Sequence, residues 1–483
     1  MRARFWVGAA TLLLAGGVAA WLLRAGPRGE PGPTAGDVLR FHSRPRLDPD
    51  RVSVVVPAHR TAPGYVFVAV KRGPGQDGPM IVDDRGHVVW FRPAPAGMAA
   101  TGFRVQRYRG RPVLTWWQGR TRFGHGMGVY VILDRRYREV ARVRAGNGYE
   151  ADLHAFRLTP QGTAYFSVYA PRAMDLTAVG GARDGAILDS IVQEVDVARG
   201  RVLWEWHSAD HVPVTEGVTS PRRGRPHDYF HVNAIDVDRD GNLLISARNT
   251  HAIYKVSRRT GAIIWRLGGK HSDFAFGAGA RFAFQHDVHR RPDGTISLFD
   301  NEATPAQAQQ SRGLVLRLDM RRRTARVVRA YTHPDKLLAG AEGNVQTLRN
   351  GDVFVGWGPQ EHVSELSRGG RLLFDLRLPP GSDTYQAFRS PWQGEPLDRP
   401  ALAARRAGGR VTAWASWNGA TELRGWELLA GDDPADLRPV ATAPRRDFET
   451  ALTARTGARW VAVRALGADG RPLALSQPTA VGD

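Results

Sequence analysis

Histidine and asparagine side chains recur at one position of a repeated hairpin, and these residues are the best placed in the sequence for chemistry. His154, Asn233 and His286 each stand eight residues before the glycine of a hairpin turn. Asn344 takes the same place in a fourth hairpin, whose turn is one residue shorter. Because equivalent positions on the innermost strands of a circular repeat converge on its axis, we expect these four side chains to lie together.

His231 and Arg248 extend this set. His231 stands two residues before Asn233, so the period of a strand places both side chains on one face. Arg248 ends the hairpin that Asn233 begins, and antiparallel pairing should return it beside His231. With His154 and His286, the predicted axial cluster holds three imidazoles, one amide and one guanidinium.

This set of side chains suits chemistry on a tetrahedral anion. A neutral imidazole whose pKa is held down by a nearby cation can act as a nucleophile. The guanidinium of Arg248 offers a fixed fork of donors to an oxyanion, and Asn233 and Asn344 can donate further hydrogen bonds. A single histidine at a strand start is usually a turn or edge residue, but three in one repeat frame favour a functional site.

A metal centre is the alternative, since three imidazoles could bind zinc or copper. The nearest carboxylates, Asp152 and Asp287, sit at adjacent strand positions and should point to opposite faces. Arg248 would also repel a cation. We therefore expect neither a metal nor another cofactor, and keep a His-ligated metalloenzyme as a second hypothesis.

Hairpins of two types must position these residues. One type is a strand, a polar turn and a strand that often ends on Trp, as in Met80 to Trp90 and Ala252 to Trp265. The other type turns on glycine, as in Asn233 to Arg248 and His286 to Asn301. Six alternating pairs predict an all-β fold, with a six-bladed β-propeller over residues 51–392.

The chain begins with a membrane signal and ends with a smaller domain. An apolar run from Phe5 to Leu23, flanked by arginines, predicts a signal anchor or signal peptide over residues 1–24. A Pro/Gly-rich linker is expected over residues 25–50, and short strand patterns predict a fibronectin-like β-sandwich over residues 393–483. We expect a single-pass cell-membrane protein with its catalytic domain extracytoplasmic, or a secreted protein if the signal is cleaved.

Composition excludes several classes of protein. The 483 residues carry a formal net charge of +20 and no cysteine. The absence of cysteine excludes disulfides, thiolate catalysis and Cys-ligated zinc. The positive excess is almost all arginine and is spread along the chain, which argues against a nucleic-acid-binding footprint. We therefore expect no nucleic-acid partner, but a surface that attracts anions at low salt.

Four segments resemble those of bacterial arylsulfate sulfotransferases of the ASST-like group. They are Phe230-His-Val-Asn-Ala-Ile-Asp-Val, Ile245-Ser-Ala-Arg-Asn, Ile264-Trp-Arg-Leu-Gly-Gly and Phe284-Gln-His-Asp-Val. The resemblance covers roughly residues 60 to 392. The tail pieces Ser416-Trp-Asn-Gly-Ala-Thr and Phe448-Glu-Thr are similar to those of actinobacterial-type members.

The resemblance implies transfer of a sulfuryl group from a phenolic sulfate ester to a phenolic acceptor, without the nucleotide donor that cytosolic enzymes use. In that family a histidine becomes a transient sulfohistidine in a ping-pong cycle, and the matching position here is His286. His154 and His231 match the assisting histidines, while Asn233 and Arg248 match the groups that hold the sulfuryl oxygens. The resemblance thus points to the same five residues as the repeat.

This chain also departs from the family pattern. It lacks the N-terminal β-sandwich and the disulfide of the better-studied periplasmic members, and it adds a C-terminal sandwich. A propeller that binds a glycan or another protein without catalysis therefore stays open, beside the metalloenzyme. The physiological donor, the acceptor and the oligomeric state are left open by the sequence.

Overall fold

The computed structural model describes residues 35–481. All of the strands described below belong to one compact unit, Pro33–Asp483. The predicted signal over residues 1–24 lies outside the described residues. Within residues 35–481, no helix is both long enough and apolar enough to span a bilayer.

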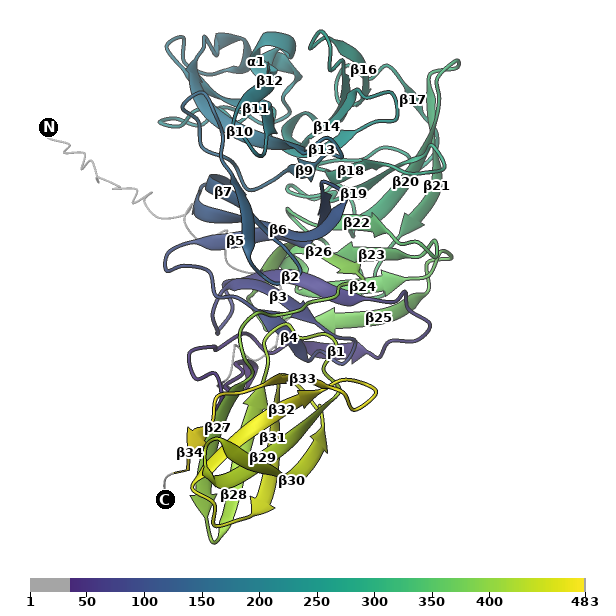
Figure 1. Ribbon diagram of the computed structural model, residues 1–483. Coiled ribbons are helices and arrows are strands. Elements are labelled where there is room, and N and C mark those ends of the chain that lie inside the picture. The colour runs from purple at the N-terminus through teal and green to yellow at the C-terminus, as the bar shows by residue number, and fades with distance from the viewer. Residues whose placement is uncertain (1–34, 482–483) are drawn as a thin grey trace, which may run out of the picture. The chain divides into compact units, whose positions relative to one another are not determined.

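The described residues form an all-β structure of eight sheets, in which β17 and β21 are a parallel pair and the other strand pairs are antiparallel. The predicted fold class is thereby confirmed at the level of all-β. Six sheets of four or five strands make a propeller-like part, and two further sheets contain the last strands of the chain (Figure 1).

Each of the six sheets contains a meander of three or four consecutive strands. One contains β26 (Asp383–Ser390), β2 (Tyr65–Lys71), β3 (Gly78–Val82) and β4 (Val88–Phe91). The next contains β5 (Ala99–Tyr108), β6 (Arg111–Arg122), β7 (His125–Leu133) and β8 (Glu139–Val143). The third contains β9 (Phe156–Leu158), β10 (Thr163–Ala173), β11 (Ala186–Asp196) and β12 (Val202–His207).

The remaining three follow the same plan. The fourth contains β13 (Val232–Val237), β14 (Leu243–Ala247), β15 (Ala252–Val256) and β16 (Ile263–Gly268). The fifth contains β18 (His286–Arg290), β19 (Ile296–Asp300), β20 (Arg312–Asp319) and β21 (Thr324–Tyr331), with β17 (Ala275–Phe276) beside β21. The sixth contains β22 (Asn344–Thr347), β23 (Val353–Gly356), β24 (His362–Leu366) and β25 (Leu372–Arg377), with β1 (Ser53–Val56) beside β25.

The innermost strands of the six sheets close into a ring. Along the order β5, β9, β13, β18, β22 and β26, each strand contacts the next, and β26 contacts β5. β26 also pairs with β2, from Tyr65 opposite Ser390 to Lys71 opposite Asp383. The last strand of the ring thus completes the first sheet, which joins the two ends of this part of the chain.

The predicted glycine turns are formed between the first two strands of three sheets. Gly162, Gly241 and Gly294 have φ of 83°, 78° and 85°, in the left-handed region that favours glycine. In the β13–β14 hairpin, the Gly241 N–H donates to the Asp238 carbonyl at 2.9 Å. These turns return each second strand to the end of the sheet where the first strand began.

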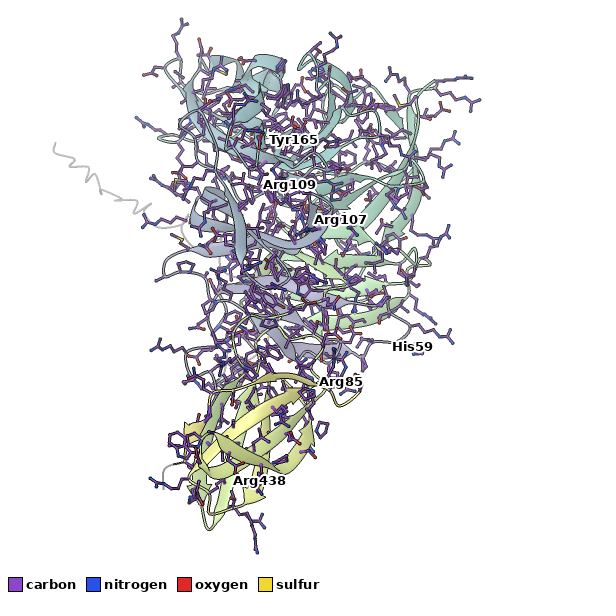
Figure 2. All side chains as sticks on the ribbon, in the orientation of Figure 1. His59, Arg85, Arg107, Arg109, Tyr165 and Arg438 are labelled. Carbon is purple, nitrogen blue, oxygen red and sulfur yellow. The ribbon has the colours of Figure 1, made fainter. Side chains whose placement is uncertain are left out.

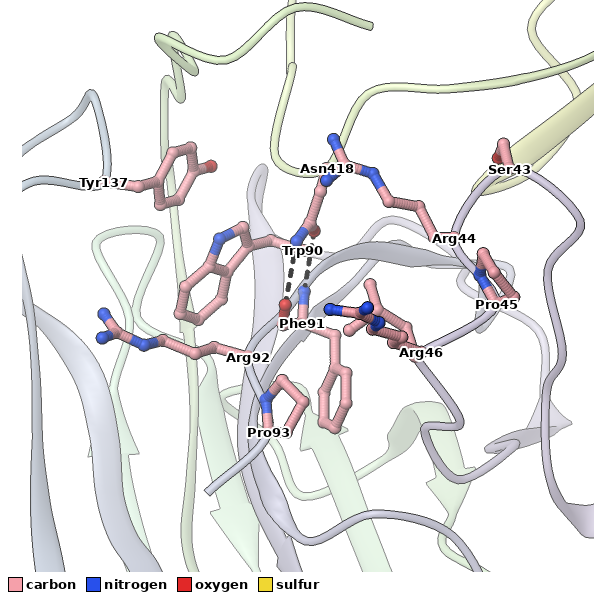
Figure 3. A pocket seen from close by; sticks show the side chains of 11 residues that line it. Ser43, Arg44, Pro45, Arg46, Trp90, Phe91, Arg92, Pro93, Tyr137 and Asn418 are labelled. Atoms are coloured by element: carbon pink, nitrogen blue, oxygen red, sulfur yellow. Dashed lines mark hydrogen bonds between the residues drawn. The ribbon is translucent and has the colours of Figure 1, made fainter. Parts of the chain in front are cut away.

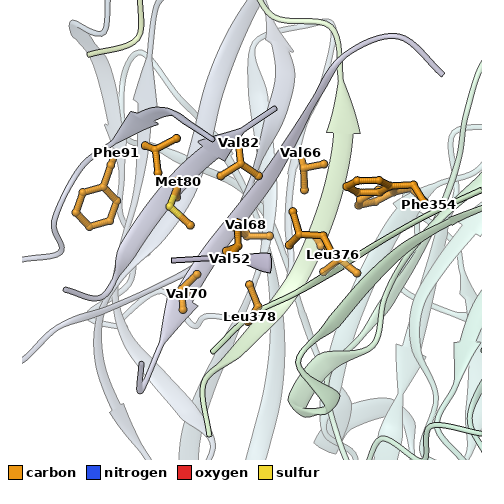
Figure 4. Close-up of a cluster of buried hydrophobic side chains, with 14 of the residues drawn as sticks. Val52, Val66, Val68, Val70, Met80, Val82, Phe91, Phe354, Leu376 and Leu378 are labelled. Carbon is orange, nitrogen blue, oxygen red and sulfur yellow. The ribbon is translucent and has the colours of Figure 1, made fainter. Parts of the chain in front are cut away.

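The core of the ring lies between the faces of neighbouring sheets. In the cluster of Figure 4, side chains from β2 and β3 pack against side chains from β23 and β25, including Val66, Val68, Met80, Val82, Phe354 and Leu376. Each such side chain contributes roughly 1.5–3 kcal/mol when it leaves water. Because both faces of a ring sheet are covered, strands such as β2 are continuous apolar runs rather than alternating ones.

The two remaining sheets enclose a separate core. One contains β27 (Ala401–Ala407), β28 (Arg410–Ser416) and β31 (Glu449–Arg455). The other contains β29 (Gly425–Asp433), β30 (Asp436–Pro444), β32 (Trp460–Leu466) and β33 (Pro472–Leu475), with β34 (Thr479–Ala480) beside β32. Val411, Trp426 and Val461 are among the buried side chains between them.

The described part of the expected linker, residues 25–50, is packed rather than free. The Glu449 carboxylate accepts hydrogen bonds from the backbone N–H groups of His42 (3.1 Å) and Ser43 (2.6 Å). Phe41 packs against the core cluster of Figure 4. This segment differs from an open linker because its apolar side chains find a surface on which to leave water.

Candidate active site

His154 is held by a buried carboxylate in the segment before β9. The His154 Nδ1 lies 2.6 Å from Asp152 Oδ2, and that oxygen also accepts the Ser167 hydroxyl at 3.0 Å. Burial raises the pKa of Asp152, but the charge and hydrogen bond of His154 outweigh it and lower the pKa to about 2. Because an ionised carboxylate only accepts, Nδ1 carries a proton and Nε2 is the nitrogen left for chemistry.

His231 and His125 share a second carboxylate. Asp228 Oδ2 lies 2.5 Å from His231 Nδ1 and 3.2 Å from His125 Nε2. Burial alone would raise the pKa of Asp228, but the two histidines bring it well below its ordinary value. Asp228 therefore stays ionised, and it holds His231 with Nδ1 as the donor.

The pKa values of the two histidines on Asp228 are shifted in opposite directions. Burial lowers the pKa of His231 to about 4, with the Asp228 charge opposing it, so this ring is neutral at pH 7. Burial also acts to lower the pKa of His125, but its hydrogen bond to Asp228 and the charge of that carboxylate raise the pKa overall. Of the two rings, His125 is therefore the first to take up a proton as the pH falls.

His231 does not lie on a regular strand. Its φ is +60°, and the equivalent residues of two other hairpins, Phe284 and Glu342, have φ of +55° and +63°. The period of a strand therefore does not extend from Asn233 to His231, contrary to the argument from the sequence. A non-glycine residue in this region costs of order 1–3 kcal/mol. The hairpin nevertheless returns Arg248 to His231, whose carbonyl accepts the Arg248 N–H at 2.9 Å.

His286 begins β18, and Asn301 determines which of its nitrogens carries the proton. The Asn301 amide NH₂ donates to the carbonyls of Ala339 and Glu342, both at 3.0 Å, so its oxygen must face His286. That oxygen lies 2.7 Å from His286 Nδ1. Nδ1 is then the protonated nitrogen, and Nε2 holds the lone pair, toward which the Glu342 N–H points at 3.3 Å.

Burial and a nearby cation keep His286 neutral. Its side chain is 2% exposed. Burial lowers the pKa of His286 well below its ordinary value, and the charge of Arg248 lowers it further. His286 Nε2 is therefore an unprotonated, oriented nitrogen at neutral pH, which is what a nucleophile requires.

The Arg248 guanidinium lies over an aromatic ring beside the histidines. Its Cζ is 4.8 Å from the centroid of Phe284. Its NH groups donate to Asn249 Oδ1 at 2.9 Å and to the Gly340 carbonyl at 3.1 Å. No carboxylate of residues 35–481 forms an ion pair with Arg248, so its charge is available to an anion.

The two predicted binding asparagines lie in different surroundings. Asn233 donates one amide hydrogen to the Gln285 carbonyl at 2.7 Å, which leaves a second hydrogen. Asn344 instead clasps β26, because its NH₂ donates to the Ala387 carbonyl and its oxygen accepts the Ala387 N–H, both at 2.8 Å. One donor hydrogen of the Asn344 amide is left over, as in Asn233, so its expected role in substrate binding stays a prediction.

The other five predicted residues gather around two tyrosines. The ring centroids of His154 and His231 are 4.7 Å apart. Tyr385 from β26 lies 5.5 Å from His154 and 6.3 Å from His286, and its hydroxyl reaches the Asn233 carbonyl at 3.5 Å. Tyr169 lies 5.7 Å from His231. The hairpins therefore bring His154, His231, Asn233, Arg248 and His286 to one place.

Several residues of the site were missed by the sequence analysis. Tyr169 and Asn301 end the hairpins that His154 and His286 begin, as Arg248 ends its own hairpin. That register was a usable signal for both of them. The repeat carries no comparable signal for the other three, His125, Asp228 and Tyr385.

Among residues 35–481, two groups of side chains could hold a metal ion by composition, His125–Asp228–His231 and His333–His362–Asp375. In the first, both rings already hydrogen-bond the same carboxylate oxygen. In the second, His333 Nδ1 accepts the Asp335 N–H at 3.1 Å, so the neutral ring keeps its proton on Nε2, the nitrogen that faces Asp375. Both groups fit hydrogen-bonded clusters better than metal sites.

The pocket in Figure 3 does not contain the histidines. It has a volume of about 450 Å³ and is lined by side chains of residues 43–47, by residues 90–93, and by Tyr137 and Asn418. The Asn418 amide clasps the Phe91 backbone, accepting its N–H at 3.0 Å and donating to its carbonyl at 2.9 Å. β4, to which Phe91 belongs, is the outermost strand of its sheet. This pocket is therefore separate from the site on the innermost strands.

The comparisons with known proteins give one family. A family model described as Arylsulfotransferase (ASST) matches residues 104–378, more than half of the chain. That span includes all six site residues predicted from the sequence. Comparison with curated proteins gave no match.

Solved structures match only distantly. A protein of unknown function from Bacteroides caccae is 14% identical, covering 68% of this chain and 100% of that one, with a TM-score of 0.42. A catalytically inactive virginiamycin B lyase from Staphylococcus aureus, solved with quinupristin, is 8% identical, covering 76% and 96%, with a TM-score of 0.36. A protein of unknown function from Dyadobacter fermentans is 11% identical, covering 68% and 93%, with a TM-score of 0.37. The description of the fold therefore rests on the strand pairing above.

Proposed function

We propose, from the premise that this chain belongs to the arylsulfotransferase family, that it moves a sulfuryl group from a phenolic sulfate ester to a phenolic acceptor. One observation carries the proposal. His286 is neutral, its Nδ1–H is held by Asn301, and Nε2 lies within the field of the Arg248 cation. This is the arrangement expected of a nitrogen nucleophile that attacks an anionic ester.

In the first half of the cycle, His286 Nε2 attacks sulfur in line with the aryl oxygen. The nitrogen–sulfur bond forms as the sulfur–oxygen bond breaks, and the phenolate leaves. Arg248 and the second amide hydrogen of Asn233 steady the sulfuryl oxygens, while Asn301 stabilises the positive charge that develops on the His286 ring. Nε2 must exchange its 3.3 Å hydrogen bond from Glu342 for the bond to sulfur.

In the second half, a phenolic acceptor takes the sulfuryl group. His231 is neutral and its Nδ1–H is held by Asp228, so its Nε2 can remove the acceptor proton. The acceptor oxygen then attacks sulfur, and the electrons of the broken nitrogen–sulfur bond return to His286. His154, whose Nδ1 faces Asp152, gives a proton from Nε2 to the departing phenolate of the first half when that nitrogen is protonated. The proton that the neighbouring His231 removes from the acceptor replaces it, so the cycle returns to its starting state.

The proposal also covers the domains, the location and the partners of the protein. We infer that the ring of sheets is a six-bladed β-propeller over residues 51–392, supported by the closure through β26. Residues 393–483 are proposed to be a fibronectin-like sandwich, and residues 1–24 a signal anchor or signal peptide. The catalytic part would then be extracytoplasmic, on the cell membrane or secreted. We propose an aryl sulfate and a phenol as the partners, with no cofactor and no nucleic acid.

The test is transfer from 4-nitrophenyl sulfate to phenol by the full-length protein. We expect release of 4-nitrophenol, and an acid-labile sulfuryl adduct on the peptide containing His286 when the acceptor is left out. The variant His286→Ala should lose transfer by at least about a thousandfold while keeping its thermal unfolding temperature. Turnover by that variant at the rate of the unchanged protein would contradict the assignment of the nucleophile.

A further inference from the structure

The two-residue turn between β6 and β7 contains a residue type that is unusual for such turns. Arg122 pairs with His125, so the turn consists of Phe123 and Gly124, with φ of +52° and +85°. Such two-residue turns favour Asn-Gly, Asp-Gly or Gly-Gly, because both positions need positive φ. A bulky aromatic residue in the first position is strained. Burial of the ring does not explain why phenylalanine stands at this position, since Phe123 is 63% exposed.

The same turn is attached to the candidate active site. His125, two residues after Phe123, lies 3.2 Å from Asp228 and has its ring 5.2 Å from that of His231. Its ring also lies 4.4 Å from Tyr169. The strained, exposed phenylalanine is therefore carried on the segment that forms one wall of the histidine cluster.

A second segment meets the turn at the same place. Arg225 stands three residues before Asp228, and its Cζ is 3.9 Å from the centroid of Phe123. The Cζ of Arg122 is 5.1 Å from that centroid. The β6–β7 turn and the segment that precedes β13 are thus in contact twice. One contact is between His125 and Asp228, and the other is between Phe123 and Arg225.

The charges of these arginines are not neutralised. Within residues 35–481, neither Arg122 nor Arg225 forms an ion pair with a carboxylate. Arg225 belongs to an exposed loop that also carries Arg222 and Arg223. An exposed ring with two unpaired guanidinium groups is complementary to a small aromatic molecule that bears an anionic group.

We propose that Phe123, Arg122 and Arg225 form a subsite for the aryl sulfate donor at the edge of the histidine cluster. This inference rests on the proposed function. The aromatic ring of the donor lies against the exposed part of Phe123, and a guanidinium pairs with its sulfate oxygens as it approaches His286. The neutral phenolic acceptor lacks the anionic group, so the two arginines discriminate the donor from the acceptor.

The experiment measures binding apart from turnover. The Kd of 4-nitrophenyl sulfate is determined by calorimetry on the full-length His286→Ala protein, with and without a second change. Phe123→Gly should raise this Kd about fivefold, and Arg225→Ala by a similar factor. Phe123→Gly should also keep or raise the unfolding temperature, because glycine relieves the strain at positive φ.

Arg109→Gly is the matched control. Arg109, labelled in Figure 2, and Gly110 form the same kind of turn at the other end of β6, with φ of +51° and +76°. The 12 residues of β6 separate this turn from Phe123. This variant should leave the Kd unchanged. For neutral phenol, we expect no effect of Arg225→Ala.

The outcomes separate this inference from the proposed function. A Kd that rises in Phe123→Gly supports the subsite even if the unchanged protein shows no turnover. Sulfuryl transfer with an unaltered Kd in both variants overturns the subsite and leaves the function standing. No binding of 4-nitrophenyl sulfate to the His286→Ala protein at millimolar concentration also overturns the subsite.

Discussion

At the residue scale, the site works through the different surroundings of chemically identical side chains. His231 and His286 are buried and neutral, whereas the neighbouring Asp228 raises the pKa of His125. Each ring has a fixed donor nitrogen because a carboxylate or an oriented amide oxygen faces it. A nucleophile and a base are thus obtained from one residue type.

These protonation states predict how stability depends on pH. The pKa of His231 is about 4 in the folded protein and near 6.5 when unfolded, so the unfolded chain binds more protons between these values. Folding stability should therefore fall as the pH drops from about 6.5 to 4, by up to about 3 kcal/mol for this group. Asp228, whose pKa is lowered, loses its own contribution only below this window.

Urea unfolding of the unchanged protein and of His231→Gln, at several pH values between 4 and 7, isolates this contribution. The variant cannot titrate at this position, so its stability should depend less steeply on pH. Identical slopes for the two proteins would show that His231 titrates normally in the folded state.

At the element scale, side-chain amides fasten strands to neighbouring backbone. Asn344 clasps β26 through Ala387, and Asn418 clasps β4 through Phe91, each with two hydrogen bonds. Such an amide satisfies a backbone N–H and a carbonyl that the strand ladder leaves free. The position of Asn344, which the sequence predicts to bind substrate, therefore also helps to close the ring.

The change Asn344→Ala tests this assignment. It leaves the N–H and carbonyl of Ala387 buried without partners, which should cost about 2–4 kcal/mol of unfolding free energy. If the Asn344 amide serves only to hold Ala387, the KM for 4-nitrophenyl sulfate should change less than twofold. Asn418→Ala removes the same pair of bonds at the outermost strand and serves as the matched comparison. A large rise in KM without loss of stability would instead restore Asn344 to the binding site.

At the scale of the whole molecule, the excess of arginine produces a positive surface without one basic patch. Arg85, Arg107 and Arg438 lie on well-separated parts of the structure (Figure 2). The formal net charge of +20 is thus distributed over the surface, with the loop of Arg222, Arg223 and Arg225 close to the site. A field of this sign draws an anionic substrate inward and is screened by salt.

Salt should therefore affect the two substrates differently. Raising the ionic strength from about 0.05 to 0.5 M should raise the KM for an aryl sulfate several-fold, since the Debye length falls from roughly 14 to 4 Å. The KM for neutral phenol, measured separately in the ping-pong cycle, should stay constant. Equal changes in both KM values would indicate a general effect of salt on the protein rather than electrostatic attraction.

Local patterns in the sequence determined the all-β class, the hairpins and much of the site. Turn glycines such as Gly241 and runs of β-branched residues depend on neighbours a few positions away, so they can be read directly. The repeat then aligned His154, Asn233 and His286, because equivalent positions of a circular repeat lie at equivalent places. The packed segment within residues 25–50 could not be foreseen, since its binding surface comes from distant parts of the chain.

Only the tertiary structure decided what each aligned residue does. Asn233 and Asn344 share a register, yet one lies at the histidines and the other is bound to Ala387. Likewise, Asp228 orients His231 through a contact that the repeat does not record. Hydrogen bonding acts over about 3 Å and depends on direction, so its partners are known only when the strands have been placed in space.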